Sequence, residues 1–302
     1  MPKIEFDNPF RAPGKWWRGN LHTHSNRSDG ELPPRATAER YRDIGYDFLA
    51  ITDHLVPSEP FEPPPGLLIV PGGEYHTEAG SPPRCWHFGV LGAGGPVQGA
   101  NGPVDALYAS VRKNARFHWL AHPNWSSLVE DDVLDVRTAP AVEVFNGVCE
   151  KVIDRGCSEP VWDYALACGA RMNALAVDDT HVAEEIGRGW IMLRAEKLAL
   201  DAVFAALDRG HWYSTTGPQI HDVRLSGNVV SVWCSPARSI KFMARSWDGK
   251  CVAARAGSRI ESAEYEIKGS ETYVRVQVED ENGRKAWTNP LYVTPVPGEG
   301  KP

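Results

Sequence analysis

Short apolar segments alternate with helix-like segments over about the first two thirds of this 302-residue chain. The apolar segments cover residues 48–52, 67–72, 87–92, 117–122, 141–146 and 172–177. Between them, residues 33–45, 103–116 and 159–169 carry apolar side chains three and four positions apart, the first opening on two prolines and the last closing on a glycine, as helices do. Strands and helices that alternate in this way predict an α/β fold with a parallel sheet, most simply a barrel.

The pattern changes after residue 221. The segments 228–235, 239–246, 263–269, 273–280 and 286–293 alternate apolar and polar residues, are separated by polar turns, and contain no helical stretch. Short strands in such a series predict a small all-β sandwich of about 80 residues. We therefore divide the chain into an α/β domain, residues 1–217, and an all-β domain, residues 218–302.

The stretch "LHTHSNRSDG" places two histidines one residue apart, ahead of Asp29. Side chains two apart on a strand point to the same face, so His22 and His24 are able to bind one metal ion. Taken alone, the pair is equally well explained as polar residues at the edge of a hairpin. The rest of the chain has to decide between these two explanations.

Histidines and carboxylates recur where the predicted strands end. In an α/β barrel the active site lies at the carboxyl ends of the strands, so residues that follow the apolar segments should converge there. Histidines and carboxylates that merely face solvent would occur on helix faces and in loop centres as often as at strand ends. Their recurrence at strand ends therefore favours a metal site. The residues that follow the strands are Asp53, His54, Glu74, His122, Asp178, Asp179 and His181.

Composition excludes several other classes of protein. No apolar run approaches the roughly 20 residues of a membrane-spanning helix, and the first residues lack the apolar core of a signal peptide. The net charge of −7 gives no basic surface for long nucleic acids. Six cysteines without CxxC spacing argue against a zinc knuckle or a disulfide framework. We expect a cytoplasmic protein that acts on a small molecule, without membrane association.

Five motifs, in the order "LHTHSNRSDG", "AITDH", "PGGE", "AHP" and "VDDTH", resemble those of the PHP phosphoesterases, a family named for polymerase and histidinol phosphatase. The resemblance covers residues 21–181 and implies a distorted seven-stranded β/α barrel. It also implies two or three divalent ions, Mn, Fe or Zn. The ligands that it implies are His22, His24, Asp29, His54, Glu74, His122, Asp179 and His181, with His87 at a further histidine position.

The resemblance distinguishes the two aspartates of "VDDTH". The family's form is Asp, any residue, His, so Asp179 is the expected ligand and Asp178 is expected to orient a ligand. Glu74 is an isolated carboxylate after an early strand and therefore suits a bridge between two ions. Glu74, Asp179 and His181 are the candidate catalytic residues.

Three residues are candidates for binding substrate. Arg27 and Arg188 are the cationic residues nearest in sequence to the expected ligands, although surface arginines are equally common. Asn146 closes a predicted strand at the edge of the site. His76 and His118 also lie near expected ligands, and we expect His118 to be structural.

The C-terminal region carries a second resemblance. Its segments "YSTTGPQI", "VWCSP" and "RKAWTNPLYV", within residues 213–293, resemble the C-terminal extension of a PHP branch that includes carbaryl hydrolases. The resemblance assigns no chemistry to the region. We expect it either to cover the edge of the barrel or to pair subunits in a homo-oligomer.

These observations lead to one expected function and two alternatives. The leading prediction is a metal-dependent phosphoesterase that cleaves a small phosphomonoester or phosphodiester with a metal-bridging hydroxide. An amide or carbamate hydrolase of the same fold is the first alternative. A binding protein that keeps the metal only as a structural clip is the second, and a broken ligand set would favour it. None of the implied ligand positions is replaced here.

Overall fold

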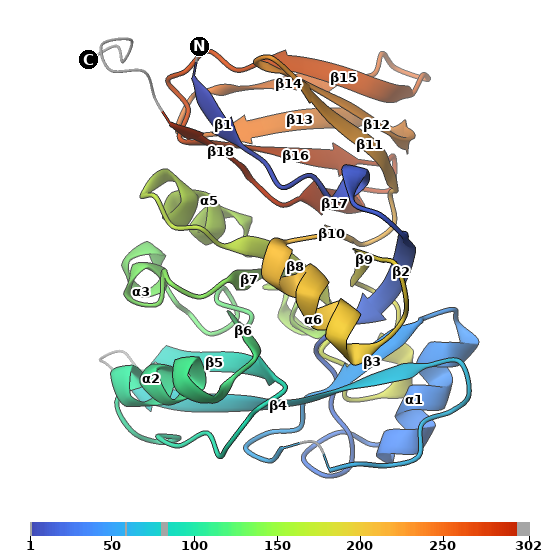
Figure 1. Ribbon diagram of the computed structural model, residues 1–302, viewed down its shortest axis with the longest axis vertical. Coiled ribbons are helices and arrows are strands. Elements are labelled where there is room, and N and C mark those ends of the chain that lie inside the picture. Colours follow the sequence, from blue (N-terminus) through green and yellow to red (C-terminus); the bar gives the residue numbers. More distant parts are fainter. Residues whose placement is uncertain (1, 58, 80–83, 295–302) are drawn as a thin grey trace.

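The computed structural model describes residues 2–57, 59–79 and 84–294 (Figure 1). A long mixed sheet runs through the molecule, and a second antiparallel sheet of three strands packs against one end of it. The strands are β1 (Lys3–Glu5), β2 (Lys15–Asn20), β3 (Phe48–Ile51), β4 (Leu68–Ala79), β5 (Arg84–Leu91), β6 (Phe117–Leu120), β7 (Ala141–Asn146), β8 (Asn173–Val177), β9 (Trp190–Ala195), β10 (Trp212–Thr215), β11 (Ile220–Ser226), β12 (Val229–Ala237), β13 (Ser239–Ala244), β14 (Gly249–Ala253), β15 (Ile260–Glu266), β16 (Tyr273–Glu279), β17 (Lys285–Thr288) and β18 (Leu291–Thr294).

Six α-helices and two short 3₁₀ turns connect the strands of the described ranges. They are α1 (Pro34–Asp43), α2 (Val104–Asn114), α3 (Glu130–Asp135), α4 (Gly147–Ile153), α5 (Glu159–Ala167), α6 (Leu200–Arg209), η1 (Pro9–Arg11) and η2 (Ala183–Glu185). No helix in these ranges is long and apolar enough to cross a membrane.

The predicted α/β class is confirmed. Strands β2, β3 and β4 are parallel neighbours, β6, β7 and β8 are parallel neighbours, and β5 lies antiparallel between the two groups. A parallel bridge between Thr23 and Thr180 joins the segments that follow β2 and β8, so this run of strands returns on itself. The sheet also branches from β2 into β9 and β10, and the count of seven barrel strands stays a prediction.

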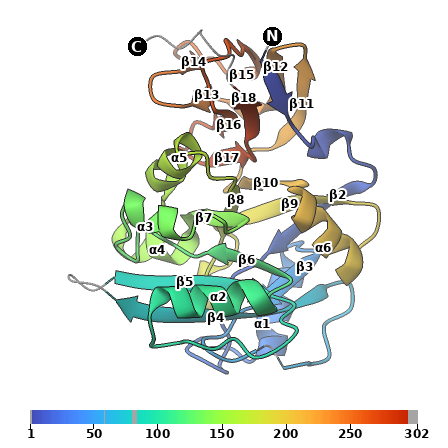
Figure 2. The same cartoon turned by 60° about the vertical axis from the view of Figure 1, so that its left-hand side comes forward.

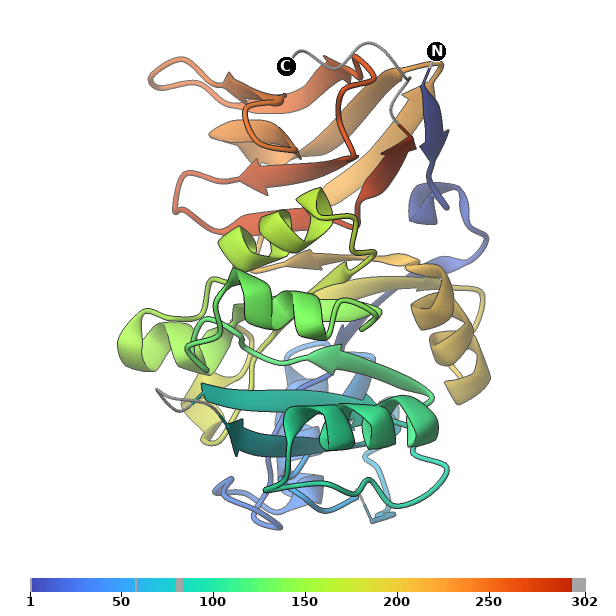
Figure 3. The same cartoon turned by 90° about the vertical axis from the view of Figure 1, so that its left-hand side faces the viewer.

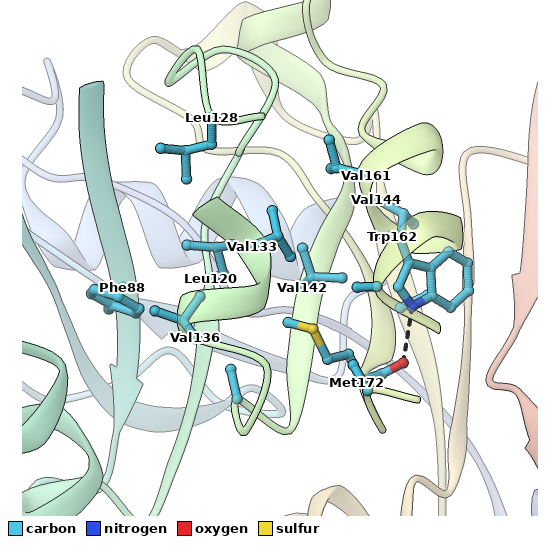
Figure 4. Close-up of a cluster of buried hydrophobic side chains, with 14 of the residues drawn as sticks. Phe88, Leu120, Leu128, Val133, Val136, Val142, Val144, Val161, Trp162 and Met172 are labelled. Atoms are coloured by element: carbon cyan, nitrogen blue, oxygen red, sulfur yellow. Dashed lines mark hydrogen bonds between the residues drawn. The ribbon is translucent and has the colours of Figure 1, made fainter. Parts of the chain in front are cut away.

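Helices cover the outer face of the curved sheet, and α2 lies over the hairpin of β4 and β5 (Figure 2). Side chains from β5, β6 and β7 meet those of α3 and α5 in a large hydrophobic cluster (Figure 4). Trp162 of α5 is fully buried there, and its indole N–H donates to the carbonyl of Met172 at 2.9 Å. The helices thus hold the strands whose ends carry the candidate ligands.

The C-terminal region is all-β, as predicted for the residues after 221. Strands β11, β12 and β15 form the small sheet, which packs across an apolar core on β13, β16 and β18. The hydrogen-bonded sheet is continuous with the rest of the molecule, because β17 pairs with β10. Strand β1, from the chain's start, pairs with β18 beside the N-terminal label in Figure 1.

These pairings differ from the expected separation at residues 217 and 218. That boundary falls in the turn between β10 and β11, but β10 pairs with β9 on one side and with β17 on the other. Residues 3–5 belong by pairing to the C-terminal sheet. The two-domain division itself stays a prediction, whereas the hydrogen bonding joins the two regions.

A buried ionic network fastens α5 to β16, which lie side by side in Figure 3. The guanidinium of Arg275 is fully buried and donates to Asp163 at 2.7 and 2.6 Å and to Glu159 at 3.2 Å. Lys285 of β17 donates to the second oxygen of Glu159 at 2.6 Å. Two cations and two carboxylates therefore satisfy one another across the junction of the two regions.

Candidate metal centre

The implied ligands converge on one region of the barrel. The two histidines of the first motif follow β2, His54 follows β3, His122 follows β6, and Asp179 and His181 follow β8. Glu74 and His87 lie inside β4 and β5, which are longer than the apolar segments of the sequence. Strand ends from both parallel groups therefore face the same space, as expected for a barrel of this kind.

Four atoms form the innermost group. Nε2 of His22 lies 3.3 Å from Oε2 of Glu74 and 3.2 Å from Oδ1 of Asp179. Nε2 of His24 lies 3.4 and 3.0 Å from the same two oxygens, and 3.2 Å from Nε2 of His22. Donor atoms at 2.0–2.1 Å from a four-coordinate ion are about 3.3 Å apart, so these separations match a tetrahedral shell.

The second oxygen of Glu74 faces another pair of imidazoles. Its Oε1 lies 2.8 Å from Nδ1 of His87 and 3.0 Å from Nε2 of His122. Glu74 is the residue common to both groups, with one oxygen toward each. This is the arrangement that a carboxylate bridging two ions requires, and it places His87 with the other implied ligands.

A third group lies nearer to solvent. Oδ2 of Asp29 is 3.5 Å from Nε2 of His54 and 3.4 Å from Nε2 of His181. His24 offers its other ring nitrogen within reach of the same group. The structure thus gathers all nine implied ligands into three neighbouring groups, while their role as ligands stays a prediction.

Unpaired buried atoms show that the site fits a cation. Oε2 of Glu74, Oδ1 of Asp179 and Nδ1 of His54 are buried and have no hydrogen-bond partner. Buried carboxylate oxygens without donors cost free energy, and a divalent ion bound to them removes that cost. Histidine and carboxylate ligands suit Zn, Mn and Fe.

The backbone is strained at two of these residues. His122 has φ of 25° and Asp179 has φ of 57°, in the left-handed region that non-glycine residues seldom adopt. Asp179 is held there by its N–H, which donates to the carbonyl of His22 at 3.0 Å. Strain of this kind occurs at functional sites, where the surrounding structure imposes it.

Glu143 is a residue of the site that sequence reasoning missed. It lies in the middle of β7, is fully buried, and accepts from Nδ1 of His22 at 2.6 Å and from Nε1 of Trp119 at 2.7 Å. The backbone N–H of His122 and the amide of Asn146 donate to its other oxygen. The proton on Nδ1 leaves Nε2 of His22 free to bind an ion. A charged residue inside the apolar segment "AVEVFN" was the available signal.

Two other aspartates hold loops of the site. Asp53 accepts from the backbone and the hydroxyl of Ser25, both at 2.7 Å, and so fixes the first motif. Asp178 accepts from three successive backbone N–H groups, of residues 187, 188 and 189, at 2.6–2.9 Å. Asp178 therefore anchors this loop, while its expected role in orienting a ligand stays a prediction.

The three candidates for substrate binding are not among the residues that line the cavity described below. Arg27 donates to the carbonyl of Glu59 at 2.7 Å, and neither it nor Arg188 lines the cavity described below. Asn146 is fully buried and donates to Glu143 and Asp179 at 3.0 Å each, while its oxygen caps α4. Asn146 is placed to position Asp179, and the binding of substrate by the three residues stays a prediction.

His76 and His118 differ in their surroundings. His76 lies opposite His87 in the β4–β5 pair, and His54, His76 and His87 offer ring nitrogens within 4.8 Å of one another. His118 packs edge-on against Tyr108, away from the candidate ligands, and burial lowers its pKa to about 4. The described structure thus places His118 with the packing residues, as expected.

The charges of the site shift the pKa values of its imidazoles. Burial lowers the pKa of His22, but Asp179, Glu143 and Glu74 together raise it well above its ordinary value. Burial also lowers the pKa of His181. The hydrogen bond to Asp29 outweighs burial and raises that pKa to about 9. Both shifts favour the protonated imidazole in the metal-free protein, so a cation that binds there competes with protons.

A cavity of about 370 Å³ opens onto the centre. Its polar lining consists of Asp29, His54, Glu74, His87, His122, Asp179, His181 and Glu185. The other lining residues, Trp125, Val148, Cys149 and Val152, are here called its apolar side. Among the described residues that line it there is no lysine or arginine.

The chain resembles solved structures although no protein-family profile and no curated protein sequence matches it. A two-domain protein from Bacteroides vulgatus ATCC 8482, containing a predicted PHP-like metal-dependent phosphoesterase, aligns over 91% of this chain and 95% of that chain, with a TM-score of 0.50 and 18% identity. PsfC from Pseudomonas syringae PB-5123 aligns over 64% of this chain and 87% of that chain, with a TM-score of 0.43 and 15% identity. The first comparison confirms the PHP-like fold predicted from the motifs, whereas the likeness to the carbaryl-hydrolysing branch stays a prediction.

Proposed function

We propose that the protein is a metal-dependent hydrolase that cleaves a small phosphomonoester or phosphodiester. The position of Glu74 carries the proposal, because its two oxygens face separate groups of imidazoles and suit a bridge between two ions. The PHP-like fold agrees with this chemistry. Two or three ions, Mn, Fe or Zn, fit the three groups of ligands.

Divalent ions in such a site supply hydroxide near neutral pH and neutralise charge on substrate oxygens. The residues of the chain supply the geometry. Asp179 and Glu74 would bind the ions with buried oxygens, and His181 would complete the group that opens onto the cavity. Glu143 would keep His22 in the tautomer that binds through Nε2. Glu74, Asp179 and His181 thus keep their proposed catalytic role, exercised through the ions they hold.

A phosphoester is the favoured substrate because its charged oxygens are attracted by several cations in a partly dehydrated site. A carbamate or other amide ester is the second candidate. It is favoured by the lining of the cavity, which among the described residues has an apolar side and no lysine or arginine to pair with a second phosphate oxygen. A neutral substrate would need no such partner.

Metal analysis combined with a substrate screen tests the proposal. Metal-free protein is reloaded with Mn, Fe or Zn, and the bound ions are counted before kcat/KM is measured for phosphomonoesters, phosphodiesters and aryl carbamates. We expect at least two ions per chain and turnover of phosphoesters above the metal-only background. Less than one ion per chain would contradict the proposal, and turnover of carbamates alone would support the second candidate.

A pair of aspartate variants makes the test specific. Asp179→Asn removes a charged ligand without a change of shape, so metal content and activity should fall together. Asp201→Asn alters an exposed aspartate of α6 that pairs only with Lys197 in the described structure, and should change neither. A metal-loaded protein without hydrolytic activity would favour the metal-clipped binding protein instead.

A further inference from the structure

We infer that the substrate carries an apolar group, aryl or branched alkyl, which binds against Trp125, Val148 and Val152 beside the candidate metal centre. The inference rests on the proposed function, since it takes the reacting bond to lie at the ions. It concerns the part of the substrate that lies away from the reacting bond and does not contact the metal-binding residues. The cavity has one polar side and one apolar side, and the three residues belong to the apolar side.

Trp125 lies directly beside the candidate ligands. Its ring is edge-on to His122, with centroids 5.0 Å apart, and to His87, with centroids 5.9 Å apart. The turn that carries it is fixed, because the N–H of Ser126 donates to the carbonyl of His122 at 3.1 Å and that of Leu128 to Pro123 at 3.0 Å. A group bound at the ions would therefore meet a positioned indole.

Val148 and Val152 belong to the same lining. They are four residues apart on α4 and therefore project from one face of that helix. The helix is fixed at its start, because Asn146 caps it and the N–H of Val148 donates to the carbonyl of Asp178 at 3.0 Å. Because Asp178 directly precedes Asp179 in the chain, the two valines have a fixed position relative to Asp179.

Two of these apolar side chains are largely exposed in the described structure. Trp125 is 39% exposed and Val152 is 62% exposed, although large apolar residues are normally covered. Leu55 and Val56, which directly follow His54, are also exposed. Apolar exposure at the mouth of a cavity is typical of a surface that a ligand covers.

Charge argues against a strongly polar substrate body. The lining carries Asp29 and Glu185 but no described lysine or arginine. Lys151, on the same helix as the valines, donates to Glu185 at 3.2 Å and is engaged there. A sugar or a second phosphate bound against the apolar side would leave its polar groups without partners, whereas an aryl or alkyl group would not.

The inference is tested with substrates that differ in the apolar group alone. Methyl phosphate and benzyl phosphate have leaving alcohols of similar acidity, and glycerol phosphate is the polar comparison. We expect kcat/KM for benzyl phosphate to exceed that for methyl phosphate by about tenfold or more in the Mn-, Fe- or Zn-loaded protein. Methyl and benzyl N-methylcarbamate make the same comparison for the second candidate substrate.

Variants assign the selectivity to the apolar side. Trp125→Ala and Val152→Ser should each lower the benzyl-to-methyl ratio by about tenfold, and Trp125→Phe should restore much of it, because a ring remains. Trp247→Ala removes a tryptophan that is 83% exposed in the turn between β13 and β14 and should leave the ratio as it is. Bound metal is counted for each variant to exclude loss of the ions.

The outcomes separate this inference from the proposed function. Turnover of phosphoesters with equal rates for methyl and benzyl would overturn the inference and leave the function standing. Turnover of carbamates alone, with the benzyl compound preferred, would overturn the proposal of a phosphoester substrate and support the inference of an apolar substrate group. If nothing is hydrolysed, calorimetry with benzylphosphonate and methylphosphonate decides, since equal binding or no binding of the two overturns the inference.

Discussion

The buried carboxylate of Glu143 connects three parts of the candidate centre, because it accepts from His22, Trp119 and the backbone of His122. Glu143→Gln would replace one accepting oxygen with a donating amide and disturb the tautomer of His22. We expect metal affinity to fall by about 10–100-fold, as when other partners of ligating histidines are lost. Titration of metal-free protein with Zn or Mn measures the change.

A second buried glutamate provides the control for this prediction. Glu271 is fully buried and accepts from Tyr265 and from the backbone of Lys268 and Gly269 in the C-terminal region. Glu271→Gln should lower stability but leave metal affinity unchanged. Equal loss of metal affinity in both variants would mean that Glu143 acts only through folding.

His87 and His118 make a matched pair of strand histidines. His87→Ala should lower the number of bound ions or their affinity, because its Nδ1 lies 2.8 Å from Glu74 and beside His122. His118→Ala should leave both unchanged, because its ring packs against Tyr108. Elemental analysis of the two variants, loaded in parallel, checks this. Full metal content in His87→Ala would remove His87 from the ligand set.

The sequence predicted ligand candidates well where the chemistry is local. His22 and His24 follow from alternation on a strand, and Asp179 and His181 from the exit of another strand. Arg27 and Arg188 do not line the cavity, because closeness in sequence does not set the direction of a long side chain, and their contact with substrate stays a prediction. Glu143 and the apolar side of the cavity depend on tertiary packing, which no single segment encodes.

At the scale of elements, apolar periodicity predicted types better than ends. The segment 141–146 coincides with β7, and 159–169 with α5 to within two residues. Strand β4 runs on to Ala79, past Gly72 at which we ended the predicted segment, because its second half pairs with β5. The added part of β4, residues 74–79, is mostly polar and lacks the apolar run by which we recognised a strand. The pairing also places Glu74 inside a strand.

The pairing of β5 with β6 gives a prediction at this scale. Gly89 lies opposite Trp119, and a Cβ at Gly89 would overlap the indole ring that donates to Glu143. Gly89→Ala should therefore lower the free energy of unfolding by about 1–3 kcal/mol, as overpacking does, and weaken metal binding as well. Urea denaturation and metal titration measure the two effects.

An open glycine in the same part of the chain is the control. Gly94 has no atom closer than 3.9 Å to the position of an added Cβ, and its φ is not positive. Gly94→Ala should change stability by no more than about 0.5 kcal/mol. If Gly89→Ala is as mild, the ring of Trp119 is free to move and its bond to Glu143 is dispensable.

At the scale of the whole molecule, the sequence separated two regions that the structure joins. The change of pattern after residue 221 is real, since the C-terminal region is all-β in its described part. The joining contacts lie between segments far apart in the chain: β1 with β18, β10 with β17, and α5 with β16. Such contacts depend on register and on single buried groups, and no periodicity in the sequence announces them.

The joined sheet and the buried guanidinium of Arg275 predict that both regions unfold together. Separation would leave Glu159 and Arg275 as buried or newly exposed unpaired charges and would open the edge of β10.

Cys149, beside the metal centre, and Cys234, in the core of the C-terminal region, are both buried free thiols and report on the two regions. Labelled in increasing urea and assigned by peptide mass spectrometry, they should become reactive at the same urea concentration. Arg275→Met should lower that common midpoint, whereas Arg224→Met, at an exposed position of β11, should not. Reactivity of Cys234 at clearly lower urea than Cys149 would instead show that the C-terminal region is an independent folding unit.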